Sequence, residues 1–282
     1  MLPYANLQEA ETALGRELSG AEKLWFKYSA KQPDFLLYYH NLPLFFLFYT
    51  LAPLPYILVH LLCSKKTQIY KLQPKNYTFS DMLTCYTRVI RTYLLTVGFL
   101  QVFSYPVVKW VGIRTNLELP SGWEMSCQIL VYFLIEDYSN YWIHRLLHCE
   151  WAYDKIHRMH HEFSSPMALA APYAHWAEIL LLGLPSFLGP AIVPGHILTF
   201  WLWFVLRQIE SIETHSGYEF PWSPAKFIPF YGGAEYHDYH HYVGAQCGNN
   251  FASVFTYCDY IYGTDKGYRY QKAIFKKAKE KL

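Results

Sequence analysis

Residues 144–161 read HRLLHCEWAYDKIHRMHH, and this stretch contains five histidines. A second dense stretch, HDYHH, occupies residues 237–241 and adds three more. Eleven of the 13 histidines in the 282-residue chain lie between His144 and His241, which an even spread would not produce. We therefore expect the chain to fold so that these two stretches, distant in sequence, meet.

The spacing of these histidines is that of neighbours on one face of an α-helix. HRLLH separates its histidines by four residues, and HRMHH and HDYHH separate theirs by three and four, so the rings of each set share a face. The ligand candidates defined in this way are His144, His148, His157, His160, His161, His237, His240 and His241. A structural zinc site closes with four ligands, so eight imidazoles predict two metal ions.

The remaining residue types restrict the kind of metal site. Imidazole binds iron, copper, zinc and nickel, so spacing alone does not name the metal. The six cysteines are scattered without a CxxC pair, and the pattern HExxH is absent, which argues against a thiolate zinc site, an iron–sulfur cluster and a zinc protease. A single histidine on an apolar face is usually a core residue, but three ordered boxes favour metal binding.

Apolar segments indicate a membrane protein. Residues 42–63 carry no acidic or basic group, and a bilayer core needs about 20 residues of helix, so this segment is a predicted span. A second apolar run covers residues 92–112, and a third, residues 126–135, leads directly into the first histidine box.

Residues 1–41 lack the pattern of a signal peptide and are expected to form a small helical cap. The net charge of +2 gives no indication of nucleic-acid binding.

The topology follows from the requirement that the boxes meet on one side of the membrane. Residues 176–206 form an apolar stretch of about 30 residues interrupted by proline and glycine, too long for one ordinary span and too short for two, which predicts an in-membrane hairpin. Residues 64–91 and the tail, residues 264–282, are rich in lysine and arginine and are expected to face the cytosol. We predict one domain: spans in 42–143, a metal-binding cap from 144–175 and 207–263, the hairpin and the basic tail.

A polar stripe precedes the first box. Asp137, Tyr141, His144 and His148 follow one another at steps of four, three and four residues, and ionisable residues at membrane depth usually mark a functional site. Asp137 and Tyr141 are therefore candidates for residues that orient a ligating imidazole. The alternative for Asp137 is an ion pair with Arg145 or another exposed cation.

Three further residues are weighed individually. Glu178 is another candidate for orienting a ligand. His175, three residues before it, is a weaker ligand candidate, with a structural role as the alternative. His196, in a Pro-Gly-His turn among apolar residues, is interpreted as structural.

The three boxes, in this order and separated by a long apolar segment, resemble the histidine-box membrane oxygenases of the fatty acid hydroxylase and sterol desaturase superfamily. The stretches YAHWAE (173–178), ETHSGYEFPWSP (213–224) and YGGAEYHDYHH (231–241) are similar to those of sterol C-4 methyl oxidases. The opening residues MLPYANLQEAETALGREL resemble the first of the two plant types. The resemblance implies that His215 is a ninth ligand. Glu219 stands where some members carry another histidine, so this position either coordinates through a carboxylate or is unused.

The resemblance also implies a fold and an activity. The fold would be an all-α integral membrane helical bundle with a cytosolic histidine-box cap, in the endoplasmic reticulum. Two iron ions, replaceable by zinc, would use O₂ to oxidise the 4α-methyl group of a 4,4-dimethylsterol, such as 24-methylenecycloartanol, through alcohol and aldehyde to carboxylate. Electrons would come from NAD(P)H through cytochrome b5 and its reductase, and a separate sterol C-4 decarboxylase would act next.

Two other functions remain open from the sequence. One is a hydroxylase or desaturase of another lipid on the same scaffold. The other is a membrane metal-binding or transport protein without enzymatic activity, which would place its ligands inside the spans near the bilayer midplane. The boxes here lie beside charged and aromatic sequence typical of a membrane boundary.

Overall fold

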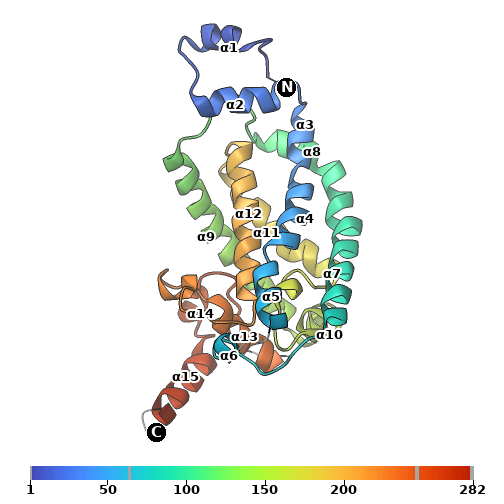
Figure 1. Cartoon of the computed structure of the whole chain (residues 1–282), viewed down its shortest axis with the longest axis vertical. Coiled ribbons are helices and arrows are strands. Elements are labelled where there is room, and N and C mark those ends of the chain that lie inside the picture. Colours follow the sequence, from blue (N-terminus) through green and yellow to red (C-terminus); the bar gives the residue numbers. More distant parts are fainter. Residues whose placement is uncertain (1, 63–64, 245–247, 280–282) are drawn as a thin grey trace.

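The computed structural model describes residues 2–62, 65–244 and 248–279, and within these ranges the secondary structure is helical, with isolated β-bridges in place of strands. This confirms the predicted all-α fold class. Figure 1 shows an elongated bundle with the N-terminal helices at one end and the C-terminal helix at the other. Cys63, Cys247 and the last three residues of the basic tail lie outside the described residues.

Two short helices, α1 (Leu7–Leu14) and α2 (Gly20–Ser29), form a cap over one end of the bundle (Figure 1). A reciprocal capping box between Ser19 and Glu22 starts α2, and Arg16 binds the same carboxylate at 2.7 Å. The indole of the buried Trp25 donates to the carbonyl oxygen of Asn116 at 3.1 Å. This contact fixes the cap to the segment that precedes the central helix.

Two long helical runs form the outer part of the bundle. The first comprises α3 (Asp34–Tyr39), α4 (Asn41–Leu51) and α5 (Leu54–Leu62). The second comprises α7 (Phe79–Tyr93), the π-helical turn η1 (Leu94–Gly98) and α8 (Phe99–Val111). Both are long and apolar enough to cross a membrane, and only 17% and 6% of their most apolar windows are buried. Since apolar helices of a soluble core would be mostly buried, these exposed surfaces are those of a membrane protein.

Both runs begin earlier than the apolar segments predicted. The first starts at Asp34, inside the expected cap, and the second at Phe79, inside the expected basic loop. A capping box between Thr78 and Asp81 starts α7, so its first turns are helical although they are polar. Hydropathy marks only the apolar part of such a helix.

Three further helices position the histidines. Helix α9 (Gly122–Leu147) packs against α11 (Trp176–Ile192), and the chain then reverses into α12 (Ile197–Thr214). A Cβ at Gly189 would lie 2.8 Å from Tyr132 Cα, so α11 approaches α9 as closely as only glycine permits. Helix α9 was expected as a third span, but it carries the charged residues Glu124, Glu136 and Asp137. Among the described residues, only the two outer runs have the length and composition of a span.

Helix α12 extends past the predicted end of the hairpin at residue 206. Its polar residues Arg207 and Glu210 are one helical turn apart and pair with each other, so the helix accommodates both of them and runs on to Thr214. Trp203 donates to the carbonyl oxygen of Ser186 at 2.9 Å, which joins the two arms of the hairpin. Both open ends, Trp176 and Thr214, therefore lie next to segments that carry histidines.

Short elements gather at the end of the bundle opposite the cap (Figure 1). They are α6 (Lys65–Gln68), α10 (Glu150–Lys155), η2 (His157–Glu162), η3 (Ala168–Ala170), η4 (Pro224–Lys226), α13 (Gly233–Val243) and α14 (Tyr257–Tyr262). The C-terminal helix α15 (Lys266–Lys279) projects away from them. Lys272 on α15 pairs with Glu235 on α13 at 2.9 Å.

Candidate metal centre

Nine histidines converge into two groups at the end of the bundle opposite the cap. The first group is His144, His148, His157, His161 and His240, and the second is His160, His215, His237 and His241. Within each group the ligand atoms all lie within 4.8 Å of one another. The two stretches that the sequence analysis expected to meet therefore do meet.

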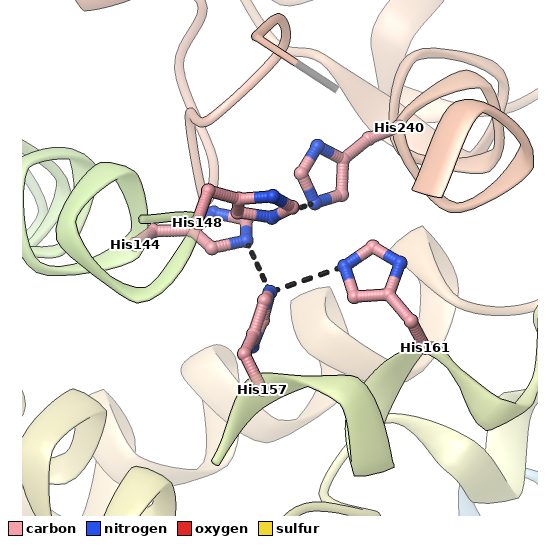
Figure 2. Close-up of side chains that lie close together, drawn as sticks. All are labelled: His144, His148, His157, His161 and His240. Atoms are coloured by element: carbon pink, nitrogen blue, oxygen red, sulfur yellow. Dashed lines mark hydrogen bonds between the residues drawn. The ribbon is translucent and has the colours of Figure 1, made fainter. Parts of the chain in front are cut away.

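The first group draws on three elements, as Figure 2 shows. His144 and His148 come from the C-terminal end of α9, His157 and His161 from η2, and His240 from α13. The Nε2 atom of His157 lies 3.1 Å from that of His144 and 3.1 Å from that of His161. His148 and His240 approach each other through Nε2 at the same distance.

The second group lies directly beside the first. His160 comes from η2, His215 caps the end of α12, and His237 and His241 come from α13. The Nε2 atom of His237 is 2.9 Å from that of His215 and 3.0 Å from that of His241. The rings of His161 and His241, one from each group, are 4.6 Å apart between centroids. The two groups are thus arranged as a pair of adjacent sites.

The HxxHH box at residues 157–161 does not form the single helical face that its spacing predicts. Residues 157–162 form a 3₁₀ helix instead of an α-helix. His157 and His161 enter the first group, whereas His160 enters the second. The box at residues 237–241 divides as well, because His240 joins the first group. Each of these boxes therefore contributes to both sites.

The hydrogen bonds of two rings in the first group show that it fits a cation. His144 Nδ1 lies 2.8 Å from the carbonyl oxygen of Phe251, and His157 Nδ1 lies 2.8 Å from Oε1 of Glu178. An acceptor at Nδ1 places the proton there and leaves Nε2 with a lone pair. The Nε2 atoms of these two rings face each other at 3.1 Å, which is repulsive unless a cation lies between them.

The second group has the same construction. His160 Nδ1 lies 3.1 Å from the carbonyl oxygen of Tyr173, and His215 Nδ1 lies 2.8 Å from that of Ser211. Their Nε2 atoms are 3.4 Å apart. Two nitrogens bound to one zinc-sized ion are about 3.0 Å apart at a right angle and about 3.4 Å apart in a tetrahedron. The donor sets present therefore fit one ion in each group.

Burial keeps the histidines neutral. Desolvation holds the pKa values of His157, His237, His240 and His241 well below the ordinary value, and neighbouring imidazoles lower them further. Desolvation also lowers the pKa of His160 to about 4. Only the deprotonated ring binds a metal ion, so these side chains are available as ligands at neutral pH.

Glu178 is the one candidate for orienting an imidazole that contacts a histidine of the two groups. Asp137 instead accepts hydrogen bonds from the backbone N–H groups of Val254 and Phe255, at 2.8 and 3.1 Å. It therefore fixes the segment that follows Phe251, whose carbonyl oxygen orients His144. The expected alternative, a pair with Arg145, is also absent from the described contacts of Asp137.

Tyr141 and His175 have structural positions. The Tyr141 hydroxyl bonds to that of Thr264 at 3.0 Å. His175 lies outside both groups and caps α11, where its Nδ1 accepts from the N–H of Ala177 at 3.3 Å. Glu219 also lies outside the groups and pairs with Lys226 at 2.9 Å.

A cavity of about 230 Å³ extends from the two groups into the bundle. The histidines that line it are His144, His157, His160, His215 and His237, and its apolar walls include Phe45, Val97, Leu182, Phe187 and Phe204. These walls come from α4, η1, α11 and α12. The histidine groups are therefore lined up along a cavity that these four elements enclose.

The sequence is similar to a known family and to several plant proteins. Residues 129–264 match the model of the fatty acid hydroxylase family. Methylsterol monooxygenase 1-1 of Arabidopsis thaliana is 61% identical over 99% of this chain and 95% of its own length. Methylsterol monooxygenase 1-2 of the same plant is 58% identical over 100% and 95%.

A rice relative carries a different activity in its name. Very-long-chain aldehyde decarbonylase GL1-10 of Oryza sativa subsp. japonica is 62% identical over 99% of this chain and 93% of its own length. No solved structure matches the chain. The matched segment contains all nine converging histidines, and the full-length relatives leave almost no part of the chain uncovered. The chain belongs to the fatty acid hydroxylase family.

Proposed function

We propose that this protein is an O₂-dependent sterol C-4 methyl monooxygenase with two iron ions. The observation that carries the proposal is the pair of adjacent groups of neutral imidazoles beside a cavity whose walls are mainly apolar. Two full-length relatives are named methylsterol monooxygenases. Iron held by these imidazoles would supply the chemistry that activates O₂ toward an unactivated C–H bond. The product series would be alcohol, aldehyde and carboxylate at the 4α-methyl group.

The side chains have separable tasks in this proposal. Nine histidines would hold the ions: His144, His148, His157, His161 and His240 the first, and His160, His215, His237 and His241 the second. Glu178 holds the proton on His157 Nδ1 and so directs Nε2 toward the ion. Phe187 and Phe204 line the cavity and exclude water from it. The 3₁₀ turn η2 supplies ligands to both ions, which keeps them adjacent.

The proposal extends to location and partners. The exposed apolar runs place the protein in a membrane, and we assign it to the endoplasmic reticulum with the histidine groups and C-terminus in the cytosol. The support is the basic composition of the loop at residues 64–78 and of α15, which suits the cytosolic surface. Electrons would come from NAD(P)H through cytochrome b5 and its reductase, and a decarboxylase would use the carboxylate.

A second candidate function is supported by the rice relative. Its name indicates a very-long-chain aldehyde as substrate, and a long apolar cavity beside a metal pair suits an aldehyde chain as well as a sterol. The two functions differ in their products. One forms an oxidised sterol and the other a hydrocarbon shorter by one carbon.

One assay separates the two functions. The full-length protein, in microsomes from a host that lacks the activity, is incubated with NADH, O₂ and either a 4,4-dimethylsterol or a very-long-chain aldehyde. We expect oxidation of the sterol methyl group that requires O₂ and disappears in His157→Ala. Glu219→Gln is the matched control, because Glu219 lies outside both groups, and it should retain turnover. Hydrocarbon from the aldehyde without sterol oxidation would replace the proposal with the second candidate.

A further inference from the structure

A buried network of charges crosses the cavity between α9 and α12. Arg207 on α12 donates from Nε to Oε1 of Glu136 at 2.7 Å and from Nη2 to the hydroxyl of Ser253 at 2.5 Å, and its Nη1 pairs with Glu210. All three nitrogens of the guanidinium are thus engaged. Glu136, Arg207, Glu210 and Ser253 all line the cavity that reaches the histidine groups.

Two acceptors of this network have no partner among the described residues. They are Oε2 of Glu136 and Oδ1 of Asn140, in side chains whose residues are 1% and 4% exposed. Asn140 Nδ2 donates to Oε1 of Glu136 at 2.6 Å. Since that carboxylate oxygen requires a donor, the orientation of the amide is fixed and its oxygen is the open atom. Buried acceptors without a donor are costly, so a ligand that brings one would bind here.

The two acceptors lie on the same face of α9 as a metal-binding histidine. Glu136, Asn140 and His144 follow one another at steps of four residues, which places them on one face of the helix. Four residues of helix rise about 6 Å. A donor held by Asn140 is therefore about one turn away from His144, a member of the first histidine group.

The chemistry of the open atoms selects the ligand. The two open acceptors can bind a hydroxyl, which can donate, and cannot bind the oxygen of a ketone, which cannot donate. The apolar walls around them, including Leu182 and Phe187, suit a hydrocarbon body with one polar group. A sterol has this composition, and its 3-hydroxyl is on the carbon adjacent to C4.

We propose that Glu136 and Asn140 form a subsite that accepts a hydrogen bond from the 3-hydroxyl of the sterol and thereby directs the C4 methyl groups toward the histidine groups. The inference rests on the proposed function and deepens it. The two residues are positioning residues, because they contact the hydroxyl and not the carbon that is oxidised. They determine specificity for 3-hydroxysterols over 3-deoxy and 3-keto analogues.

Equilibrium binding tests the subsite without catalysis. The full-length, metal-loaded protein in lipid nanodiscs is bound to a tritium-labelled 4,4-dimethyl-3β-hydroxysterol, which is then displaced by the unlabelled sterol or by its 3-deoxy or 3-keto analogue. We expect the wild type to prefer the hydroxysterol over the 3-deoxy analogue by about tenfold to hundredfold, the value of a hydrogen bond to a charged network. Asn140→Leu should reduce this preference at least about fivefold while the affinity for the 3-deoxy analogue is kept.

Two further variants complete the experiment. Ser139→Ala is the matched control, since Ser139 is the neighbour of Asn140 on α9 and, among the described residues, its hydroxyl donates to the carbonyl oxygen of Ile135 in its own helix. Its preference should equal that of the wild type. Glu136→Gln replaces the open oxygen by an amide N–H donor and should raise the affinity for the 3-keto analogue, relative to the hydroxysterol, by about tenfold. Metal content, measured on each variant, reports whether the fold is retained.

The outcomes separate the subsite from the proposed function. Equal affinity of the wild type for the hydroxysterol and the 3-deoxy analogue overturns the subsite but leaves a sterol as substrate. An unchanged preference in both Asn140→Leu and Glu136→Gln overturns it as well. Absence of any displaceable sterol binding in a protein that holds its metal ions overturns the proposed function and the subsite together.

Discussion

Buried histidines occur at both ends of the bundle, and the two ends use them differently. At the capped end, His196 is fully buried, its Nδ1 accepts from the N–H of Leu198 at 3.2 Å, and its Nε2 lies 3.0 Å from the carbonyl oxygen of Asn116. Both ring nitrogens are therefore used within the protein. At the other end, His144 and His157 use Nδ1 in the same way but direct Nε2 toward another unprotonated Nε2.

The difference shows what distinguishes a ligand from a core histidine. Burial does not, because His196 and His240 are each 0% exposed. Hydrogen bonding of one nitrogen does not either, because both have such a bond. The distinguishing feature is the second ring nitrogen. In His196 this nitrogen also has a hydrogen-bond partner in the protein, whereas in the histidine groups it faces the lone pair of another ring. Each prediction below tests this distinction or its supports.

The largest difference is expected between His240→Ala and His196→Gln. His240→Ala removes a ligand, and we expect the loss of at least one metal ion per chain and of more than about a hundredfold in sterol oxidation. His196→Gln should retain both ions and lose about 1–3 kcal/mol of stability, because its hydrogen bonds are internal. Metal analysis of the purified variants and thermal unfolding measure both effects. Equal metal contents would eliminate the distinction between the two ends.

Acid should destabilise the metal-free protein strongly. Burial lowers the pKa values of His157 and His240 well below the ordinary range and that of His160 to about 4, whereas unfolded histidines titrate near 6.5. Between about pH 6.5 and pH 4 the unfolded chain binds protons that the folded chain does not, so stability is full above this window and falls as the pH is lowered through it. Unfolding midpoints of the metal-free, detergent-solubilised protein from pH 7.5 to 4.5 test the sign, and a midpoint that rises on acidification would contradict it.

Glu178 offers a smaller effect than the loss of a ligand. Glu178→Leu removes the acceptor that holds the proton on His157 Nδ1, and we expect metal affinity to fall about 10- to 100-fold. Glu178→Gln keeps an acceptor oxygen and should lose less. Competition with a chelator measures the affinities of both variants. If the leucine and glutamine variants bound metal equally, the hydrogen bond would have no part in orienting His157.

The parts of the site that were predictable from sequence are those in which a side chain supplies the chemistry. The spacing of the boxes identified eight of the nine converging histidines, and a family resemblance added His215. Glu178, the last residue of YAHWAE, was recognised only as a candidate. Three of the rings are oriented by the carbonyl oxygens of Phe251, Asn249 and Tyr173. These acceptors could not be recognised from the sequence, because every residue has a backbone carbonyl group whatever its side chain.

The errors have related causes. Asp137 has the spacing of a residue that orients a histidine, but it binds the backbone of residues 254 and 255, which are more than one hundred positions away. His157 and His160 enter different groups, as do His237 and His240 on the α-helix α13, because the two sites lie side by side and both boxes reach them. The start of α7 at Phe79 depends on a polar capping box. Each case is decided by tertiary contacts or local hydrogen bonds to which hydropathy and periodicity are insensitive.

Adding a methyl group at Gly189 tests whether the stability of the protein depends on the close packing of α9 against α11. Gly189→Ala would place Cβ 2.8 Å from the Cα of Tyr132, a backbone atom that cannot rotate away. We expect a loss of about 1–3 kcal/mol, as for other overpacked interiors, with both ions retained. Gly183→Ala, on the same helix with no atom within 4 Å of its Cβ, should show no loss. Thermal unfolding of the two variants provides the comparison. A similar loss in Gly183→Ala would show that contact with Tyr132 is not the cause, because alanine has the higher helix propensity and should not itself destabilise α11.

The smallest expected effect distinguishes His175 from the ligands. Its Nδ1 accepts from the N–H of Ala177 at the start of α11, so His175→Ala removes a helix cap and should cost about 1 kcal/mol. His175→Asn supplies another good capping side chain and should restore that stability. Both variants should keep two ions, since the ring lies outside the two groups. If His175→Ala lost an ion and His175→Asn did not regain it, His175 would be a ligand. The contact of its Nδ1 with the backbone would then belong to a conformation without metal.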